Sequence, residues 1–160
     1  MQQESQKKPS MKNPVHFLAF GFGSGLSPKA PGTFGTLAAI PIWYLAAQLP
    51  LWGYFTVLVV VIAVGPFLCG RTADDLGVHD HSGIVWDEIA GFLLTMLFVP
   101  VSWTAVIAGF LFFRLFDIAK PWPISWLDRQ VEGGTGIMVD DLLAAVYAWV
   151  CVQAVLWCFA

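Results

Sequence analysis

The stretch APGTFGTLAAIPIWYLAAQLPLWGYFTVLVVVIAVGPFLCG, residues 30–70, decides the fold, because its 41 residues include no Asp, Glu, Lys or Arg. A helix needs about 20 apolar residues to cross the roughly 30 Å hydrocarbon core of a bilayer. The run is long enough for two crossings, and Gln48-Leu49-Pro50 supplies a turn between them. Residues 30–70 therefore predict a helical hairpin in a membrane.

Two further runs without charged residues, 89–113 and 142–160, extend the same pattern. The first is interrupted by Pro100-Val101-Ser102, which predicts a turn. The chain is 58% hydrophobic and only 12% charged, against about 25% charged in a soluble domain. We therefore expect an all-α integral membrane bundle of about five apolar helices. The expected segments are residues 34–49, 52–70, 85–99, 103–118 and 137–159, several of them short for a full crossing.

The distribution of Lys and Arg predicts the orientation of this bundle. The tail and the loops with basic residues fall on one side of the five segments, whereas the turns at Pro50 and Pro100 carry no charge. By the positive-inside rule, the charged side is cytoplasmic. Residues 1–13 are expected to form a disordered polar tail, and residues 14–160 one membrane-embedded domain, in which residues 14–26 are too short to cross. The net charge of −3 gives no indication of nucleic-acid binding, and no protein partner is implied.

The charged residues of the domain are concentrated in RLFDIAKPWPISWLDRQVEGGTGIMVDD, residues 114–141. This stretch also contains the glycines of GGTG and lies between apolar runs. A second polar stretch, HDHSGIVWDE, covers residues 79–88. We interpret the two stretches as the halves of an active site at the cytoplasmic membrane surface.

Two pairs of neighbouring carboxylates are the principal candidates for catalysis. Asp87 and Glu88 begin one apolar segment, and Asp140 and Asp141 open another. Small residues, Gly91 in the first segment and alanines in the second, follow at helical spacing and would let the two helices approach closely. If these faces meet, the acids converge and repel one another unless a cation or proton enters, and carboxylate oxygens suit Mg²⁺. The sequence leaves open which acid is a ligand and which a base.

Basic residues near these acids predict a phosphate site. Arg114, Asp117 and Lys120 recur at spacings of three residues on roughly one helix face, either as a salt-bridged helix end or as two cations and an acid that hold phosphate and metal. Lys29 precedes an expected helix start, where free amides bind anions, and Thr33 is a candidate for its cap. The alternative for this loop is ordinary helix-start chemistry.

The remaining polar candidates carry weaker signals. His79 and His81 are two residues apart with no cysteine nearby, so a hydrogen-bonding or proton-transfer role for His81 is favoured over zinc. GGTG, with Gly134, could present backbone amides to phosphate. The cysteines lack metal or redox spacing and are expected to be inert.

Four stretches taken together resemble the phosphatidylglycerophosphatase A family: LSPKAPGTFGTL (26–37), HDHSGIVWDEIAG (79–91), FRLFDIAKPWPI (113–124) and GGTGIMVDDLLAAVYA (133–148). The resemblance covers residues 14 to 158, with the motifs in the family's order. It implies a Mg²⁺-dependent phosphatase of the bacterial inner membrane that converts phosphatidylglycerophosphate in the bilayer to phosphatidylglycerol and inorganic phosphate. The family's acidic and basic motif positions fall on Asp87, Glu88, Asp117, Asp140 and Asp141, and on Lys29, Arg114 and Lys120.

The residues themselves leave two mechanisms and one rival function open. Acids beside cations are typical of metal-assisted phosphoryl transfer, by direct water attack or through an aspartyl-phosphate. The rival is a small cation carrier or channel with clustered acids along its path. A carrier needs ionisable groups near the membrane midplane, whereas the acids here are expected at segment ends.

Overall fold

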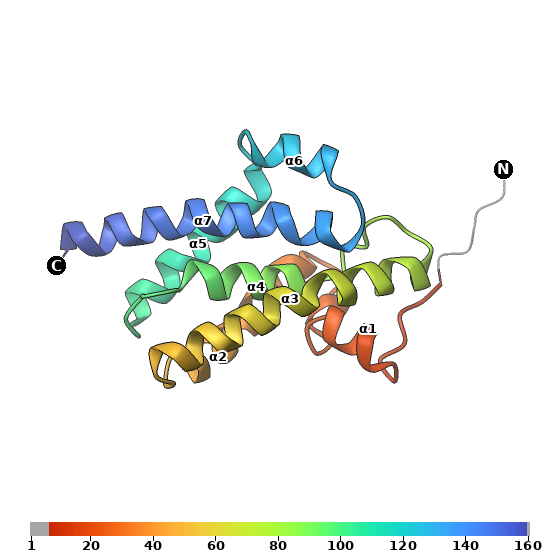
Figure 1. The fold of residues 1–160 in the computed structure, drawn as a ribbon, viewed down its shortest axis with the longest axis horizontal. Coiled ribbons are helices and arrows are strands. Elements are labelled where there is room, and N and C mark those ends of the chain that lie inside the picture. Colours follow the sequence, from red (N-terminus) through yellow and green to blue (C-terminus); the bar gives the residue numbers. More distant parts are fainter. Residues whose placement is uncertain (1–6, 160) are drawn as a thin grey trace.

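The computed structural model describes residues 7–159, and within them it is all-helical (Figure 1). Residues 1–6 of the expected tail lie outside the described part. The elements are seven α-helices and one short 3-10 helix. In chain order they are α1 (Pro14–Ala19), η1 (Ser24–Leu26), α2 (Pro31–Ala46), α3 (Leu51–Leu76), α4 (Trp86–Thr95), α5 (Trp103–Ala119), α6 (Ile124–Gln130) and α7 (Gly133–Phe159).

The two longest helices, α3 and α7, lie side by side and antiparallel (Figure 1). Gly134 lies against the backbone of Pro66 and Gly70, and Gly65 faces Met138 further along the pair. Glycine at these crossings lets the two helix backbones approach closely, as in packed membrane helices. Within residues 7–159, α3 and α7 are the helices that are long and apolar enough to cross a membrane.

The expectation of five crossings needs correction at α4. Helix α4 has ten residues, or about 15 Å at 1.5 Å per residue, which is half of a bilayer core. All of its residues except Leu94 are buried. Tyr54 donates a hydrogen bond to the Leu93 carbonyl (2.6 Å), and the Trp86 indole donates one to Val61 (3.0 Å), which fixes α4 against α3. An apolar run can be a crossing or a buried helix, and here it is the latter.

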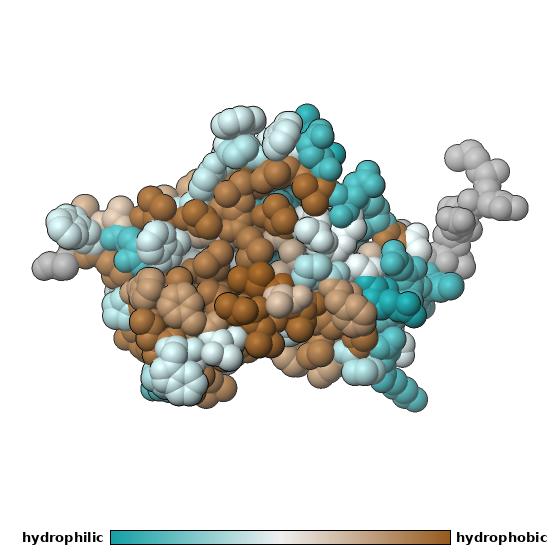
Figure 2. Space-filling view, viewed as in Figure 1, coloured by the Kyte–Doolittle hydropathy of each residue, from teal (hydrophilic) through white to brown (hydrophobic). Residues whose placement is uncertain are grey.

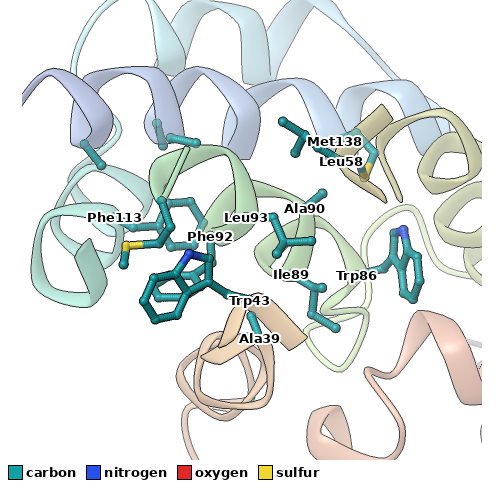
Figure 3. Packing of buried hydrophobic residues seen from close by; sticks show 14 of the residues in the cluster. Ala39, Trp43, Leu58, Trp86, Ile89, Ala90, Phe92, Leu93, Phe113 and Met138 are labelled. Atoms are coloured by element: carbon teal, nitrogen blue, oxygen red, sulfur yellow. The ribbon is translucent and has the colours of Figure 1, made fainter. Parts of the chain in front are cut away.

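Helix α4 is the centre of the hydrophobic core (Figure 3). Side chains from four other helices surround it: Trp43 from α2, Leu58 from α3, Phe113 from α5 and Met138 from α7. Gly91 lies against the Phe113 ring and the Asp141 backbone, so α4 fits closely between α5 and α7. This packing positions the first turn of α4, with its two carboxylates, inside the bundle.

Two helix starts differ from the expectation. Helix α2 begins at Pro31 after Ala30, an N-cap without a side-chain hydrogen bond, so Thr33 is not the cap. Proline favours the first helical position because it needs no hydrogen-bond acceptor there. Helix α7 begins at Gly133 and includes GGTG, so Asp141 is its ninth residue instead of lying at its opening. Packing of Gly134 on α3 compensates for the poor helix propensity of glycine.

Large apolar side chains cover much of the outer surface. Figure 2 shows hydrophobic residues across most of one face, and hydrophilic residues gathered toward the end where α3 finishes. Trp52, Trp103 and Trp157 are each at least 74% exposed. A soluble monomer rarely exposes so continuous an apolar surface, and tryptophan is enriched at membrane interfaces. The surface therefore indicates membrane association.

Candidate active site

Three buried carboxylates meet where α4 and α7 pack together. Asp87 and Glu88 lie in the first turn of α4, and Asp141 lies in the third turn of α7. One oxygen from each of the three lies within 4.8 Å of the others. The three residues are only 8%, 9% and 3% exposed. The expected convergence of two acidic stretches is present, because Gly91 permits the close approach of α4 to α7.

Burial makes the ionised form of these acids costly. It raises the pKa of Asp87 well above its usual range, and the charges of Glu88 and Asp141 raise it further. Burial likewise raises the pKa of Glu88 to about 7; the charge of Asp117 adds to this, while Arg114 opposes it. A bound cation would favour the ionised form of these acids and so offset the effects of burial and mutual repulsion on their pKa values.

The triad fits a divalent cation. Asp87 Oδ1, Glu88 Oε2 and Asp141 Oδ2 are buried and have no hydrogen-bond partner among residues 7–159. Buried polar atoms are nearly always satisfied, so three orphaned oxygens together indicate a missing partner. Hard cations such as Mg²⁺ prefer oxygen ligands, and these three residues would hold one. The other two acids expected as ligands, Asp117 and Asp140, are engaged with cations.

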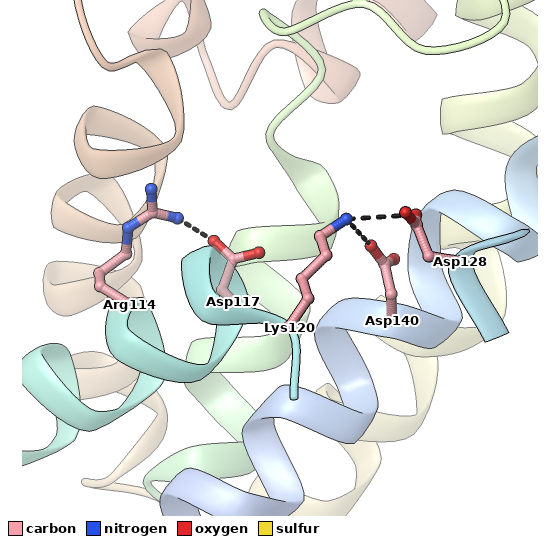
Figure 4. A network of polar contacts seen from close by, with 5 residues as sticks. All are labelled: Arg114, Asp117, Lys120, Asp128 and Asp140. Carbon is pink, nitrogen blue, oxygen red and sulfur yellow. Dashed lines mark hydrogen bonds and ion pairs between the residues drawn. The ribbon is translucent and has the colours of Figure 1, made fainter. Parts of the chain in front are cut away.

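Two of the expected cations, Arg114 and Lys120, form three ion pairs with carboxylates (Figure 4). Arg114 pairs with Asp117 one turn later on α5, and both side chains are largely buried. Lys120, at the C-terminal end of α5, donates to Asp140 on α7 (2.7 Å) and to Asp128 on α6 (3.1 Å). Burial lowers the pKa of Lys120, but the hydrogen bonds and charges of Asp140 and Asp128 outweigh it and raise the pKa above its ordinary value. Lys120 is therefore charged.

The start of α2 lies against Glu88 and Arg114. A side chain at Gly32 would come within 2.6 Å of Glu88 Oε1 and 3.1 Å of an Arg114 nitrogen. The first turn of α2 thus lies directly against the acids and the guanidinium. Pro31 has no N–H, and the amides of Thr33 and Phe34 donate to the Ala30 carbonyl, which leaves the Gly32 amide. This amide and the helix dipole attract anions. Lys29 is exposed in the loop just before this turn, and the partly buried Thr33 follows it.

Two weaker candidates have structural contacts instead. The Nδ1 atom of His81 accepts a hydrogen bond from the Gly83 amide (2.9 Å), and its ring packs on Phe20 (5.4 Å between centroids). Gly134 lies at the crossing of α7 with α3, where a side chain would overlap the Pro66 carbonyl. His81 thus orders a loop, and Gly134 serves helix packing.

Sequence reasoning missed two contributors to the site, Gly32 and Asp128. The sequence pattern assigns no role to Gly32, although a glycine directly after Pro31 is compatible with a close approach at a helix start. Asp128 was counted among the charges of its stretch without a role. The pairing of Asp128 with Lys120 depends on the packing of α6 against α7, which no local sequence pattern predicts.

The fold and the site define a class: an all-helical, membrane-associated protein whose buried carboxylates face an arginine, a lysine and a helix N-terminus. That combination is suited to metal-assisted chemistry on phosphate. The model of the phosphatidylglycerophosphatase A family matches residues 17–156, and the chain belongs to this family.

Relatives extend over nearly the whole chain. Phosphatidylglycerophosphatase A of Escherichia coli is 53% identical over 143 residues, which cover 89% of this chain and 83% of the relative. The protein of the same name from Haemophilus influenzae is 46% identical over 153 residues, 93% of each chain. A Bacteroides thetaiotaomicron relative, provisionally named a phosphatidylinositol-3-phosphatase, is 38% identical over 159 residues, 94% of this chain and 98% of its own. No solved structure matches the chain, and nothing in these comparisons supports a cation carrier.

Proposed function

We propose that this protein is a lipid phosphatase that hydrolyses the terminal phosphomonoester of phosphatidylglycerophosphate to phosphatidylglycerol and inorganic phosphate. The observation that carries the proposal is the set of orphaned carboxylate oxygens on Asp87, Glu88 and Asp141, next to Arg114 and the start of α2. Family membership supplies the substrate. We place the protein in the bacterial inner membrane with this site toward the cytoplasm, on the strength of the Lys and Arg distribution.

Substrate binding is assigned to the cationic side of the site. A phosphomonoester carries about two negative charges near neutral pH. Arg114 lies against Gly32, and the guanidinium and the Gly32 amide would hold the phosphate oxygens. Lys29 is exposed in the loop just before α2 and would approach the phosphate from the water side. An internal diester carries one charge and is more crowded, so these groups favour the monoester.

The carboxylates divide into two tasks. Asp87, Glu88 and Asp141 would hold Mg²⁺, which neutralises charge on the phosphate and lowers the pKa of water when bound. Asp140 is held by Lys120 through one oxygen, while its Oδ1 atom has no partner within residues 7–159. We assign to this oxygen the proton of the attacking water. Water oxygen then bonds to phosphorus, and the bond from phosphorus to the glycerol oxygen breaks. That oxygen takes a proton from water and becomes a hydroxyl, while Asp140 releases its proton to water.

Product analysis tests the proposal. Purified protein in mixed micelles with phosphatidylglycerophosphate should release inorganic phosphate and leave phosphatidylglycerol. Chelation should abolish turnover, and added Mg²⁺ should restore it. Appearance of diacylglycerol or phosphatidic acid would show that a different bond is cut, and full activity in excess chelator after dialysis would remove the metal from the mechanism.

The name of the Bacteroides relative motivates a second substrate in the same assay. In phosphatidylinositol 3-phosphate, as in phosphatidylglycerophosphate, the terminal phosphorus is separated from the central glycerol carbon by the same number of bonds. A site that contacts only the terminal phosphate group, and no other part of the head group, would accept both lipids. We expect phosphatidylglycerophosphate to be the better substrate, because the closer relatives carry that name.

A further inference from the structure

An apolar groove lies between the C-terminal half of α2 and the start of α5, with a volume of about 550 Å³. Its walls include Ile40, Pro41 and Tyr44 from α2, and Trp103 and Val106 from α5. Ligand sites commonly occupy about 300–1,000 Å³ and are mostly apolar. The groove is therefore large enough for part of a lipid tail, and it has the right chemistry for one.

The same two helices connect this groove to the active site. Helices α2 and α5 run antiparallel, since Gly32 lies near Arg114 at one end and Ile40 and Tyr44 face Trp103 and Val106 at the other. Ile40 lies eight residues after Gly32, and Val106 lies eight residues before Arg114. At 1.5 Å per residue, both routes from the phosphate end to the groove are about 12 Å long.

We propose that this groove holds an acyl chain of the lipid substrate while the terminal phosphate reaches Arg114, an inference that rests on the function proposed above. The head group of phosphatidylglycerophosphate places about nine bonds between the terminal phosphorus and the central glycerol carbon. At the roughly 1.2 Å per bond of an extended chain, these bonds span about 11 Å. The acyl chains therefore begin where the groove begins.

The groove contributes more to the orientation of the bound lipid than to its binding affinity. Lipid tails also surround the protein elsewhere, so an acyl chain gains little hydrophobic free energy by leaving them. Fixing one tail between α2 and α5 aligns the head group along the route to the acids, and such alignment accelerates a reaction. In phosphatidic acid only about three bonds separate the phosphorus from the same carbon, or about 4 Å. That lipid cannot occupy the groove and the phosphate site together.

Filling the groove is the direct test. Ile40→Trp places a large ring in the groove, whereas Leu45→Trp adds the same ring at a position of α2 that is 68% exposed and does not line it. The assay compares kcat/KM for dioleoyl and dihexanoyl phosphatidylglycerophosphate in dilute mixed micelles. We expect Ile40→Trp to lower the long-chain to short-chain ratio about tenfold or more, with the short-chain rate kept, while Leu45→Trp leaves the ratio unchanged. An unchanged ratio in Ile40→Trp overturns the proposal.

Photocrosslinking of the unmodified protein decides the matter if Ile40→Trp fails to fold. The probe is phosphatidylglycerol with a diazirine in one acyl chain, and the adducts are mapped by mass spectrometry. Adducts concentrated in residues 40–44 and 101–106 support the groove, and even labelling over the apolar surface overturns it. If the unmodified protein releases phosphate from neither chain length, the proposed function fails, and the crosslinks still report separately on the groove.

Discussion

Each carboxylate of the site has a different environment, and its contacts assign it a task. Asp87 has an orphaned oxygen in the triad, whereas Asp140 is tied to Lys120 and keeps one oxygen free. Asp74 is exposed near the end of α3 and belongs to neither group. These differences allow a matched set of substitutions that remove one charge each without changing side-chain size.

We expect Asp87→Asn and Asp140→Asn each to lower turnover by about 10²-fold or more, the scale of a lost charge-stabilising or proton-transfer group. Phosphate release from phosphatidylglycerophosphate measures the loss. Asp74→Asn is the control and should retain the parent rate. If Asp87→Asn and Asp140→Asn are folded and near normal in rate, the site has been assigned to the wrong residues.

Gly32 is the second residue whose change should be informative. In Gly32→Ala the new methyl would lie 2.6 Å from Glu88 Oε1, so the carboxylate or α2 must shift. We expect activity to fall about tenfold or more, because small displacements in a positioned site are costly. Alanine is also a better helix former than glycine, so the thermal unfolding midpoint should not fall greatly. A large loss of stability with normal specific activity would instead make Gly32 a packing residue.

At the residue scale, the convergence of the acidic residues could be predicted from the sequence, whereas the residues that contact them could not. Adjacent carboxylates at the starts of apolar runs, followed by small residues, indicated that the pairs Asp87–Glu88 and Asp140–Asp141 would converge. The structure brings Asp141 to the first pair, whereas Asp140 is bound by Lys120. The contact of Gly32 with Arg114 and the bond of Lys120 to Asp140 depend on how α2 and α5 approach the other helices. Such approaches follow from tertiary packing, which local patterns do not encode.

Among the elements, α4 and α7 show what hydropathy alone does not predict, namely the surroundings of a helix and the residue at which it begins. The expected helical stretches are helical, yet α4 is a buried core helix and α7 starts four residues earlier than expected. A run of apolar residues predicts a segment that is shielded from water. It does not distinguish a segment surrounded by lipid from one buried inside the protein. The glycines of GGTG have low helix propensity and are helical because α3 packs against them.

At the crossing of α3 and α7, a glycine-to-alanine substitution should lower stability, although helix propensity alone would predict an increase. Gly134→Ala would place a methyl where it overlaps the Pro66 carbonyl oxygen. Alanine in a helix normally stabilises by up to about 1 kcal/mol relative to glycine. Here we expect a destabilisation of about 1–3 kcal/mol from overpacking, measured as a lower unfolding midpoint in detergent. Thr135→Ala, at an exposed neighbouring position, is the control, and equal midpoints for both variants would contradict the close crossing.

For the whole molecule, the main property is that the site is built at one end of the bundle. Helices α2 and α4 start near it, α5 ends near it and α7 reaches it in its third turn, whereas the turns at Pro50 and Pro100 lie at the other end. The charge asymmetry of the sequence predicts the same grouping. Orientation in the membrane follows from the same asymmetry and remains a prediction.

Single cysteines in a background without Cys69, Cys151 and Cys158 measure that orientation. We expect cysteine at Ser82 or Ser125 to be protected from an impermeant thiol reagent in intact cells and labelled after the membrane is opened. Cysteine at exposed Ser102, at the opposite end of the bundle, should be labelled from outside. Labelling of the Ser82 and Ser125 positions in intact cells would place the site on the outer side.

The burial of α4 also has a consequence for biosynthesis. Asp87 and Glu88 emerge from the ribosome well before Asp141, yet all three carboxylates share one enclosed space. Until α7 follows, α4 lacks one wall of its surroundings, and its acids cannot be enclosed as they are in the finished protein. We therefore expect a nascent chain that stops before α7 to be recognised as unfinished by membrane proteases, and completion of the last helix to be the step that both closes the core and assembles the catalyst.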